Sequence, residues 1–306
     1  MPDFQVVAEG LLFPEGPVVQ EDGSILLVEI QRETITRVKP DGTVEVVAKL
    51  GGGPNGLAMG PDGALYVANN GGFLFQTIAG FNRTRSGVHP DYTSGRIERF
   101  DLKTGELRTL YDHCGEHMLC GPNDIVFDHK GGFYFTDMGK NRQRDRDHAG
   151  LYYGLADGSH IVEVAYPLTT ANGVGLSPDD SIVYVSETET GRLWAFDLEE
   201  PGRVRKHPHP SPNGGRLICG LPGYQRFDSM AVDAYGNICV ATLASGCVTV
   251  VSPEGQVLRQ VMFPDPMVTN ICFGGPDMKT AYITLSGTGQ LVSMDWPEPG
   301  LPLAYS

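Results

Sequence analysis

Residues 119–137 read LCGPNDIVFDHKGGFYFTD. A Gly-Pro pair and an asparagine precede a short apolar run, a turn follows at Lys130-Gly131, and a second run rich in aromatic residues returns. Two such runs joined by a turn predict a β-hairpin. Asparagine is depleted in strands, so the position of Asn123 at the head of the first run requires an explanation.

The same arrangement occurs six times along the 306-residue chain. Each copy has a short polar residue, an apolar run, a turn seven or eight positions later and a returning β-branched or aromatic run. Successive copies start 40, 68, 49, 56 and 42 residues apart. Such spacings are typical of β-propeller blades once loop insertions are allowed. The six leading residues are Glu15, Asn55, Asn123, Asn172, Asp228 and Asn270.

Further hairpins lie between these copies and complete the repeat. They begin at Ile35, Arg96, Leu151, Arg192 and Val248. Two hairpins per repeat make a four-stranded blade. The sixth copy has only one further strand, from Gln290, while the N-terminal run FQVVAEG from Phe4 has no neighbour in the sequence with which to pair. We therefore predict an all-β fold, a single six-bladed β-propeller domain over residues 1–306, closed by the N-terminal strand, which joins the last blade and removes open sheet edges.

Composition narrows the classes of partner. Forty glycines and twenty-two prolines, spread evenly, indicate many turns between short elements. A net charge of −14 argues against nucleic-acid binding, which needs a basic surface. The first residues lack the features of a secretion signal, and no apolar run is long enough to span a bilayer. We expect a cytoplasmic protein with free thiols, a small-molecule partner and no membrane partner.

In a propeller the first strand of every blade starts near the central channel, so the six leading residues should surround one axis. Two carboxylates and four amides form an oxygen set without Cys or His, which suits a hard divalent cation. Ca²⁺ is the expected ion, Mg²⁺ and Mn²⁺ are alternatives, and Zn²⁺ suits the set less well. Alternatively, Asn and Asp at these positions form Asx turns that start the strands. Two carboxylates confined together repel each other without a cation, which favours the ion site.

Several motifs together resemble the SMP-30/gluconolactonase/regucalcin-like family of six-bladed propellers. The resemblance implies that Glu15, Asn172 and Asp228 bind a catalytic cation. It also implies that Asn123 is either a fourth ligand, as in fluorophosphatase-type propellers, or a substrate contact. One departure is Gly121, which stands where regucalcin-type members have an arginine that holds the sugar. The matching segments are FPEGP from Phe13, GPNG from Gly53, GPND from Gly121, ANGVGLSPDD from Ala171, FDSMAVDAYGN from Phe227 and TNICFGG from Thr269.

The resemblance implies a metal-dependent lactonase that opens a sugar lactone. A cation would polarise the lactone carbonyl and lower the pKa of a bound water. Asp228 is the expected proton acceptor, and Glu15 is chiefly an anchor. Asp124 is either an acid that orients ligands or a plain strand residue. Asn55 and Asn270 are expected to contact the substrate or to support the ligands.

The longest insertion, residues 69–95, is a candidate lid over the channel. Within it Arg83, Arg85 and His89 either meet an anionic substituent of a lactone or are solvated. The charged loop of residues 139–148 is expected to be solvated. Two other functions remain open at this point: a phosphotriesterase or fluorophosphatase-like hydrolase, since a cation also polarises a phosphoryl oxygen, and a propeller that serves only as a binding scaffold.

Overall fold

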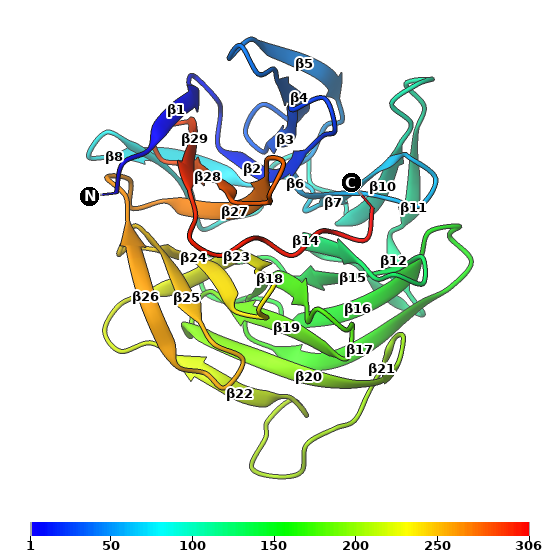
Figure 1. The fold of residues 1–306 in the computed structure, drawn as a ribbon. Helices are drawn as coiled ribbons and strands as arrows, with labels where there is room; N and C mark the ends of the chain where they lie inside the picture. Colours follow the sequence, from blue (N-terminus) through cyan, green and yellow to red (C-terminus); the bar gives the residue numbers. More distant parts are fainter. Residues whose placement is uncertain (1, 306) are drawn as a thin grey trace.

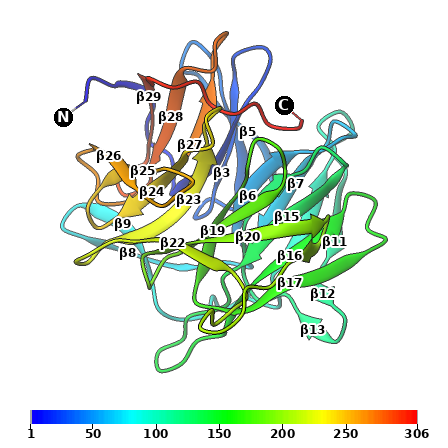
Figure 2. The same cartoon turned by 60° about the horizontal axis from the view of Figure 1, so that its bottom comes forward.

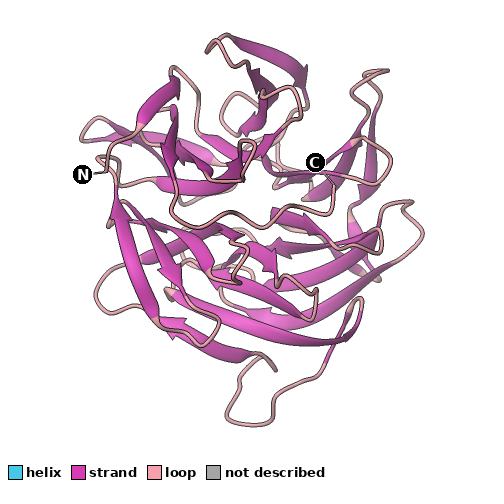
Figure 3. Cartoon of the chain, in the orientation of Figure 1, coloured by secondary structure: helices cyan, strands magenta, loops and turns pink. Residues whose placement is uncertain are grey.

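The computed structural model describes residues 2–305, and every regular element within them is a β-strand (Figure 3). The strands form six main sheets arranged around a central axis, which confirms the predicted six-bladed propeller (Figure 1). Among the described residues there is no helix long and apolar enough to cross a membrane.

The blades follow the chain, and each begins with the strand nearest the axis. Blade 1 contains β2 (Pro14–Val19), β3 (Ile25–Glu29), β4 (Thr34–Val38) and β5 (Val44–Lys49). Blade 2 contains β6 (Pro54–Met59), β7 (Leu65–Asn69), β10 (Arg96–Phe100) and β11 (Leu107–Tyr111). Blade 3 contains β14 (Pro122–Phe127), β15 (Gly132–Asp137), β16 (Ala149–Leu155) and β17 (Ile161–Leu168).

Blades 4 to 6 repeat this order. Blade 4 contains β18 (Ala171–Leu176), β19 (Ile182–Glu187), β20 (Arg192–Glu200), β21 (Arg203–Val204) and β22 (Arg216–Gly220). Blade 5 contains β23 (Arg226–Val232), β24 (Ile238–Leu243), β25 (Cys247–Val251) and β26 (Val257–Met262). Blade 6 contains β27 (Val268–Gly274), β28 (Thr280–Leu285), β29 (Gln290–Asp295) and β1 (Gln5–Ala8).

The ring closes as predicted from the sequence. Strand β1 pairs antiparallel with β29, with Val6 opposite Val292, so the first strand of the chain becomes the outer strand of the last blade. Figure 1 shows β1 (blue) beside β29 (red). The hydrogen bonds of this closure hold the two ends of the ring together.

Blade 4 differs from the prediction. The sequence favoured an outer strand directly after β20, but only the two-residue β21 forms there. The long outer strand is β22, which pairs with β20 through Trp194 opposite Leu217. The intervening residues 205–215 contain His-Pro-His-Pro, and proline cannot donate to a strand ladder. The outer strand therefore forms only after this segment.

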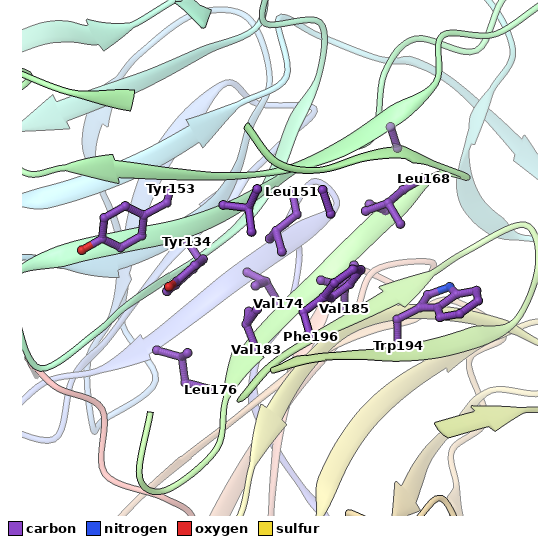
Figure 4. Close-up of a cluster of buried hydrophobic side chains, with 14 residues drawn as sticks. Tyr134, Leu151, Tyr153, Leu168, Val174, Leu176, Val183, Val185, Trp194 and Phe196 are labelled. Atoms are coloured by element: carbon purple, nitrogen blue, oxygen red, sulfur yellow. The ribbon is translucent and has the colours of Figure 1, made fainter. Parts of the chain in front are cut away.

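Hydrophobic side chains fill the spaces between adjacent blades. One cluster joins blade 3 to blade 4 and includes Tyr134 and Leu151 on one side and Val185 and Phe196 on the other (Figure 4). All four side chains are fully buried. Burial of this kind stabilises a protein by about 1.5–3 kcal/mol per large side chain. The blades are thereby held rigidly, which fixes the positions of the strand ends at the channel.

The insertion in blade 2 forms its own hairpin. Strands β8 (Leu74–Ile78) and β9 (Phe81–Arg85) pair only with each other. Figure 2 shows them on the side of the molecule away from the C-terminal segment. A second small hairpin, β12 (His113–Cys114) and β13 (His117–Met118), follows β11.

Candidate active site

Five of the six leading residues line one cavity of about 340 Å³, at the end of the channel where the inner strands begin. They come from five different blades, and all are buried. These residues are Glu15, Asn55, Asn123, Asn172 and Asp228. The sequence prediction that polar side chains gather at one axis is therefore correct for these five.

The sixth residue, Asn270, stands behind Glu15. Its Nδ2 atom donates a hydrogen bond of 2.8 Å to Glu15 Oε2. It lines a different cavity of about 610 Å³, at the opposite end of the channel, which the C-terminal segment 301–305 partly covers. Asn270 therefore reaches the candidate site only through Glu15.

Asp124 also faces the cavity at the opposite end. Its carboxylate accepts hydrogen bonds from the backbone N–H of Ile125 at 3.0 Å and from that of Val174 in blade 4 at 3.1 Å. Burial raises its pKa to about 7. The contacts of this residue tie blade 3 to blade 4.

A local irregularity in the strands explains why polar residues stand at their heads. In every blade the pairing register between the first two strands shifts at or beside the leading residue, for example between Pro122 and Ile125. Such a bulge leaves residues outside the regular ladder and redirects their side chains. Asn123 is thus placed at the channel at little cost to the sheet.

Glycines after three leading residues let the blades approach closely. A Cβ on Gly16 would lie 2.7 Å from the backbone oxygen of Asn55, and one on Gly173 would lie 2.7 Å from that of Asp228. Gly56 meets the backbone of Asn123 in the same way. These contacts pack the head of one inner strand against the head of the next. They account for the Glu-Gly and Asn-Gly pairs of the repeat.

Hydroxyl groups on the second strands fix the same backbone. Ser186 Oγ donates to the backbone oxygen of Asp228 at 2.7 Å, and Thr136 Oγ1 donates to that of Asn172. Ser286 Oγ closes the circle by donating to the backbone oxygen of Pro14 at 2.6 Å. Two leading residues are thus held by the preceding blade, and in blade 1 the residue before Glu15 is held in the same way. These contacts limit movement of the side chains at the cavity.

The amides of Asn123 and Asn172 are oriented by their own NH₂ groups. Asn123 Nδ2 donates to Met138 Sδ at 3.3 Å, and Asn172 Nδ2 donates to Thr188 Oγ1 at 3.0 Å. Asn123 Oδ1 is buried and has no hydrogen-bond partner among residues 2–305. A buried carbonyl oxygen without a partner is costly, so this atom is suited to a ligand.

The carboxylates of Glu15 and Asp228 repel each other in the cavity. Burial raises the pKa of Glu15 to about 7, although hydrogen bonds from Asn270 and Gly16 oppose the shift. Burial also raises the pKa of Asp228 well above its usual range, and the negative charge of Glu15 raises it further. Nearby positive charge would relieve both effects.

These observations fit a hard divalent cation. Within the described part of the chain, no cluster of three or more His, Cys, Asp or Glu side chains is arranged to hold a metal ion. The candidate set instead combines two carboxylates with the orphaned amide oxygen of Asn123 and with Asn172. Such an all-oxygen set is the kind that Ca²⁺ and Mg²⁺ prefer.

The β8–β9 hairpin extends over this cavity. Arg83 and Arg85 of β9 line it, as does Gln76 of β8, whereas His89 does not. The hairpin contacts blade 1 through the rings of Phe75 and Phe13, whose centroids are 5.3 Å apart.

The tip of the hairpin reaches blade 6, where the backbone N–H of Asn82 donates to the backbone oxygen of Gly287 at 2.8 Å. Contacts with blade 1 and blade 6 place the insertion across the site, where the sequence analysis expected a lid.

The charged loop of residues 139–148 was expected to be solvated, but several of its residues line the cavity. Lys140 is only 2% exposed, and Asn141 and Arg146 line the cavity beside it. Neither the repeat nor the charge pattern indicated this, because the loop differs from blade to blade. The only signal was its position directly after β15, where the second strand of blade 3 returns to the channel.

Comparison with known proteins identifies the family. The model of the SMP-30/Gluconolactonase/LRE-like region matches residues 13–287. The chain belongs to this family. The resemblance drawn from the sequence motifs is therefore confirmed, and the matched region contains all six leading residues.

The similar proteins include two curated enzymes and a solved propeller. Lactonase drp35 of Staphylococcus epidermidis is 29% identical over 285 residues, covering 91% of this chain and 76% of the relative. A gluconolactonase of Zymomonas mobilis is 26% identical over 312 residues, covering 92% and 79%. The calcium-binding protein regucalcin of Agrobacterium tumefaciens aligns with a TM-score of 0.74 at 18% identity over 98% of both chains. This last likeness shows the shared fold.

Proposed function

We propose that this protein is a metal-dependent lactonase that opens a sugar lactone. The observation that carries the proposal is the buried, unpartnered Oδ1 of Asn123 in a cavity that also contains the carboxylates of Glu15 and Asp228. Two relatives named as lactonases support the choice of a cyclic ester as the substrate.

Glu15, Asn123, Asn172 and Asp228 would hold the cation, and the calcium-binding regucalcin neighbour makes Ca²⁺ the first ion to test. When bound, the cation would favour ionisation of both carboxylates and polarise the lactone carbonyl. Glu15 is held in place by Asn270 and acts as an anchor. Asn55 lines the same cavity, and its amide NH₂ group can donate a hydrogen bond to the substrate.

Asp228 is the proton acceptor for the attacking water. Its carboxylate lines the same cavity as Glu15, Asn123 and Asn172, so it lies within the space where the attacking water would be activated. Its backbone oxygen is fixed by Ser186 Oγ. The water attacks the carbonyl carbon as Asp228 takes one of its protons, and the C–O bond to the ring oxygen then breaks while Asp228 returns that proton to the ring oxygen, which leaves as the hydroxyl of the open-chain acid.

The experiment is a panel of sugar lactones assayed by acid release, in metal-stripped protein and after addition of Ca²⁺, Mg²⁺, Mn²⁺ or Zn²⁺. The expected result is turnover of at least one lactone that chelation abolishes and one of these ions restores. Full turnover in metal-stripped protein would overturn the metal dependence. Turnover of a fluorophosphate but of no lactone would overturn the choice of substrate.

A further inference from the structure

The candidate site has a cationic wall in a protein of net charge −14. Arg83 and Arg85 of the β8–β9 hairpin and Lys140 and Arg146 of the 139–148 loop all line the same cavity as Glu15 and Asp228. None of the four has a carboxylate oxygen within 4.0 Å among residues 2–305. By contrast Arg226, which also lines the cavity, is paired with Glu189.

Lys140 makes this arrangement more than a group of solvated surface charges. Its ammonium is buried and donates to the backbone oxygen of Gly72 at 3.0 Å. It lies 5.0 Å from the ring centroid of Phe73 and 4.7 Å from that of Tyr92. The aromatic faces partly offset the cost of burying the charge. Asp137 and Asp147 act on the ammonium from a longer distance, but neither forms an ion pair with it among residues 2–305. A buried cation of this kind is a suitable partner for an incoming anion.

Two contacts hold the two cationic segments together. The backbone N–H of Gly87, just after β9, donates to the backbone oxygen of Asn141 at 2.9 Å. Asn141 Nδ2 is 3.5 Å from Ser86 Oγ in the same region. The hairpin and the loop therefore form one continuous wall, and the cations on it face a common space.

We propose that this cationic wall, formed by Arg83, Arg85, Lys140 and Arg146, binds an anionic group of the substrate that is separate from the lactone carbonyl. The preferred substrate is then a sugar lactone with a carboxylate or phosphate at its far end. The inference rests on the proposed lactonase function. Opening such a lactone yields an acid with two anionic groups. The new carboxylate would lie beside the cation held by Glu15 and Asp228, and the second anionic group would lie at the cationic wall.

The test measures binding of product acids, which does not depend on turnover. Glucarate has a second carboxylate, 6-phosphogluconate has a phosphate, and gluconate has neither. Calorimetry with Ca²⁺-loaded protein at low salt should show that at least one of the doubly anionic acids binds about 10-fold or more tighter than gluconate, since charge-assisted hydrogen bonds are stronger than neutral ones. Which of the two binds tighter distinguishes a carboxylate site from a phosphate site.

Substitutions test whether the cationic wall causes the preference for doubly anionic acids. Replacing Arg83 and Arg85 together by Gln should reduce the ratio of the affinity for the tighter doubly anionic acid to the affinity for gluconate to near one. Lys140→Met should lower this ratio as well. Arg144→Gln is the matched control, because Arg144 is exposed in the same loop and does not line the cavity. Equal or undetectable binding of the three acids by the unmodified protein would overturn the proposal, as would a ratio unchanged in the double variant.

The same preparations separate this inference from the proposed function. Hydrolysis of gluconolactone together with equal affinity for gluconate, glucarate and 6-phosphogluconate would support the proposed lactonase function and overturn the proposed anion site at the cationic wall. Tighter binding of a doubly anionic acid that the double variant loses, without hydrolysis of any lactone, would support the anion site and overturn the lactonase.

Discussion

Asn270 Nδ2 donates a hydrogen bond of 2.8 Å to Glu15 Oε2 and so joins the last blade to the first across 255 positions of sequence. The bond leaves one oxygen of the Glu15 carboxylate free for the cavity and fixes its direction. It also favours the ionised form, since it opposes the rise in the pKa of Glu15 that burial causes. This pair therefore connects the contact between the last and first blades to the candidate site.

We expect Asn270→Ala to weaken cation binding rather than to abolish the reaction. Loss of the hydrogen bond lets Glu15 rotate and raises its pKa, and loss of such a supporting contact typically lowers metal affinity about 10- to 100-fold. Titration of the metal-free variant with Ca²⁺ by calorimetry measures this. At saturating Ca²⁺ the turnover number should return to within a few-fold of the unmodified protein. Unchanged Ca²⁺ affinity would show that Asn270 has no supporting role.

Asp228→Asn should lower lactone turnover by about 10²- to 10⁴-fold, the range typical for loss of a general base. The fold should survive, because the amide has the same shape and removes the repulsion with Glu15. Circular dichroism and acid-release kinetics measure the two effects. Glu116→Gln is the control, since Glu116 is exposed in the turn between β12 and β13. Comparable loss in both variants would point to a general charge effect.

The repeat could be read from the sequence because it follows from the backbone. Each blade needs the same hairpin, so the leading polar residue recurs at the same structural position, and the bulge beside it directs its side chain to the axis. This sufficed to predict the fold and the gathering of five leading residues. The deviation of Asn270 could not be predicted, because its orientation depends on a contact with Glu15 across the ring closure.

The loops were predicted less well for a physical reason. Lys140 is buried because residues from another blade, Gly72 and Phe73, cover it, and no local pattern in a charged loop reports such a contact. The outer strand of blade 4 was misplaced because pairing with β20 resumes only after a proline-containing segment. The position of the insertion near the channel was anticipated from its length and its place in blade 2, but its hairpin structure and its contacts were not.

Without a cation, the protein should become less stable as the pH rises from about 4.5 to about 7. The pKa of Glu15 is raised to about 7 in the folded state, so this group binds more protons folded than unfolded in that window. Asp124, with a pKa of about 7, acts in the same direction. Between these pH values the shift of Glu15 alone should lower the free energy of unfolding by an amount on the order of 3 kcal/mol, since one pKa unit corresponds to about 1.4 kcal/mol.

Thermal unfolding of metal-free protein between pH 5 and pH 8 measures this slope. Ca²⁺ should raise the melting temperature more at pH 8 than at pH 5, because it binds the ionised carboxylates. Glu15→Gln should flatten the slope and remove most of the Ca²⁺ effect. A metal-free protein that is more stable at pH 8 than at pH 5 would contradict the assignment of raised pKa values to this site.

The β8–β9 hairpin should control access of the substrate to the cavity. Its contact with blade 1 through Phe75 and Phe13 is an aromatic pair, and such pairs contribute about 0.5–1.5 kcal/mol. Phe75→Ala should therefore shift the hairpin toward an open position and raise KM about 3- to 10-fold. The turnover number should change less, because Asp228 and the ligand residues stand on the blades.

Steady-state kinetics and limited proteolysis together test this role. Cleavage within residues 74–85 should be faster in Phe75→Ala, and saturating substrate or product should slow it again. Ile78→Ala is the matched control, since Ile78 lies at the end of β8, is 48% exposed and does not line the cavity. A hinged lid that closes over the substrate should first show weaker substrate binding when its contact with blade 1 is lost. If Phe75→Ala instead lowers the turnover number and leaves KM and the cleavage rate unchanged, the hairpin is a fixed wall of the site.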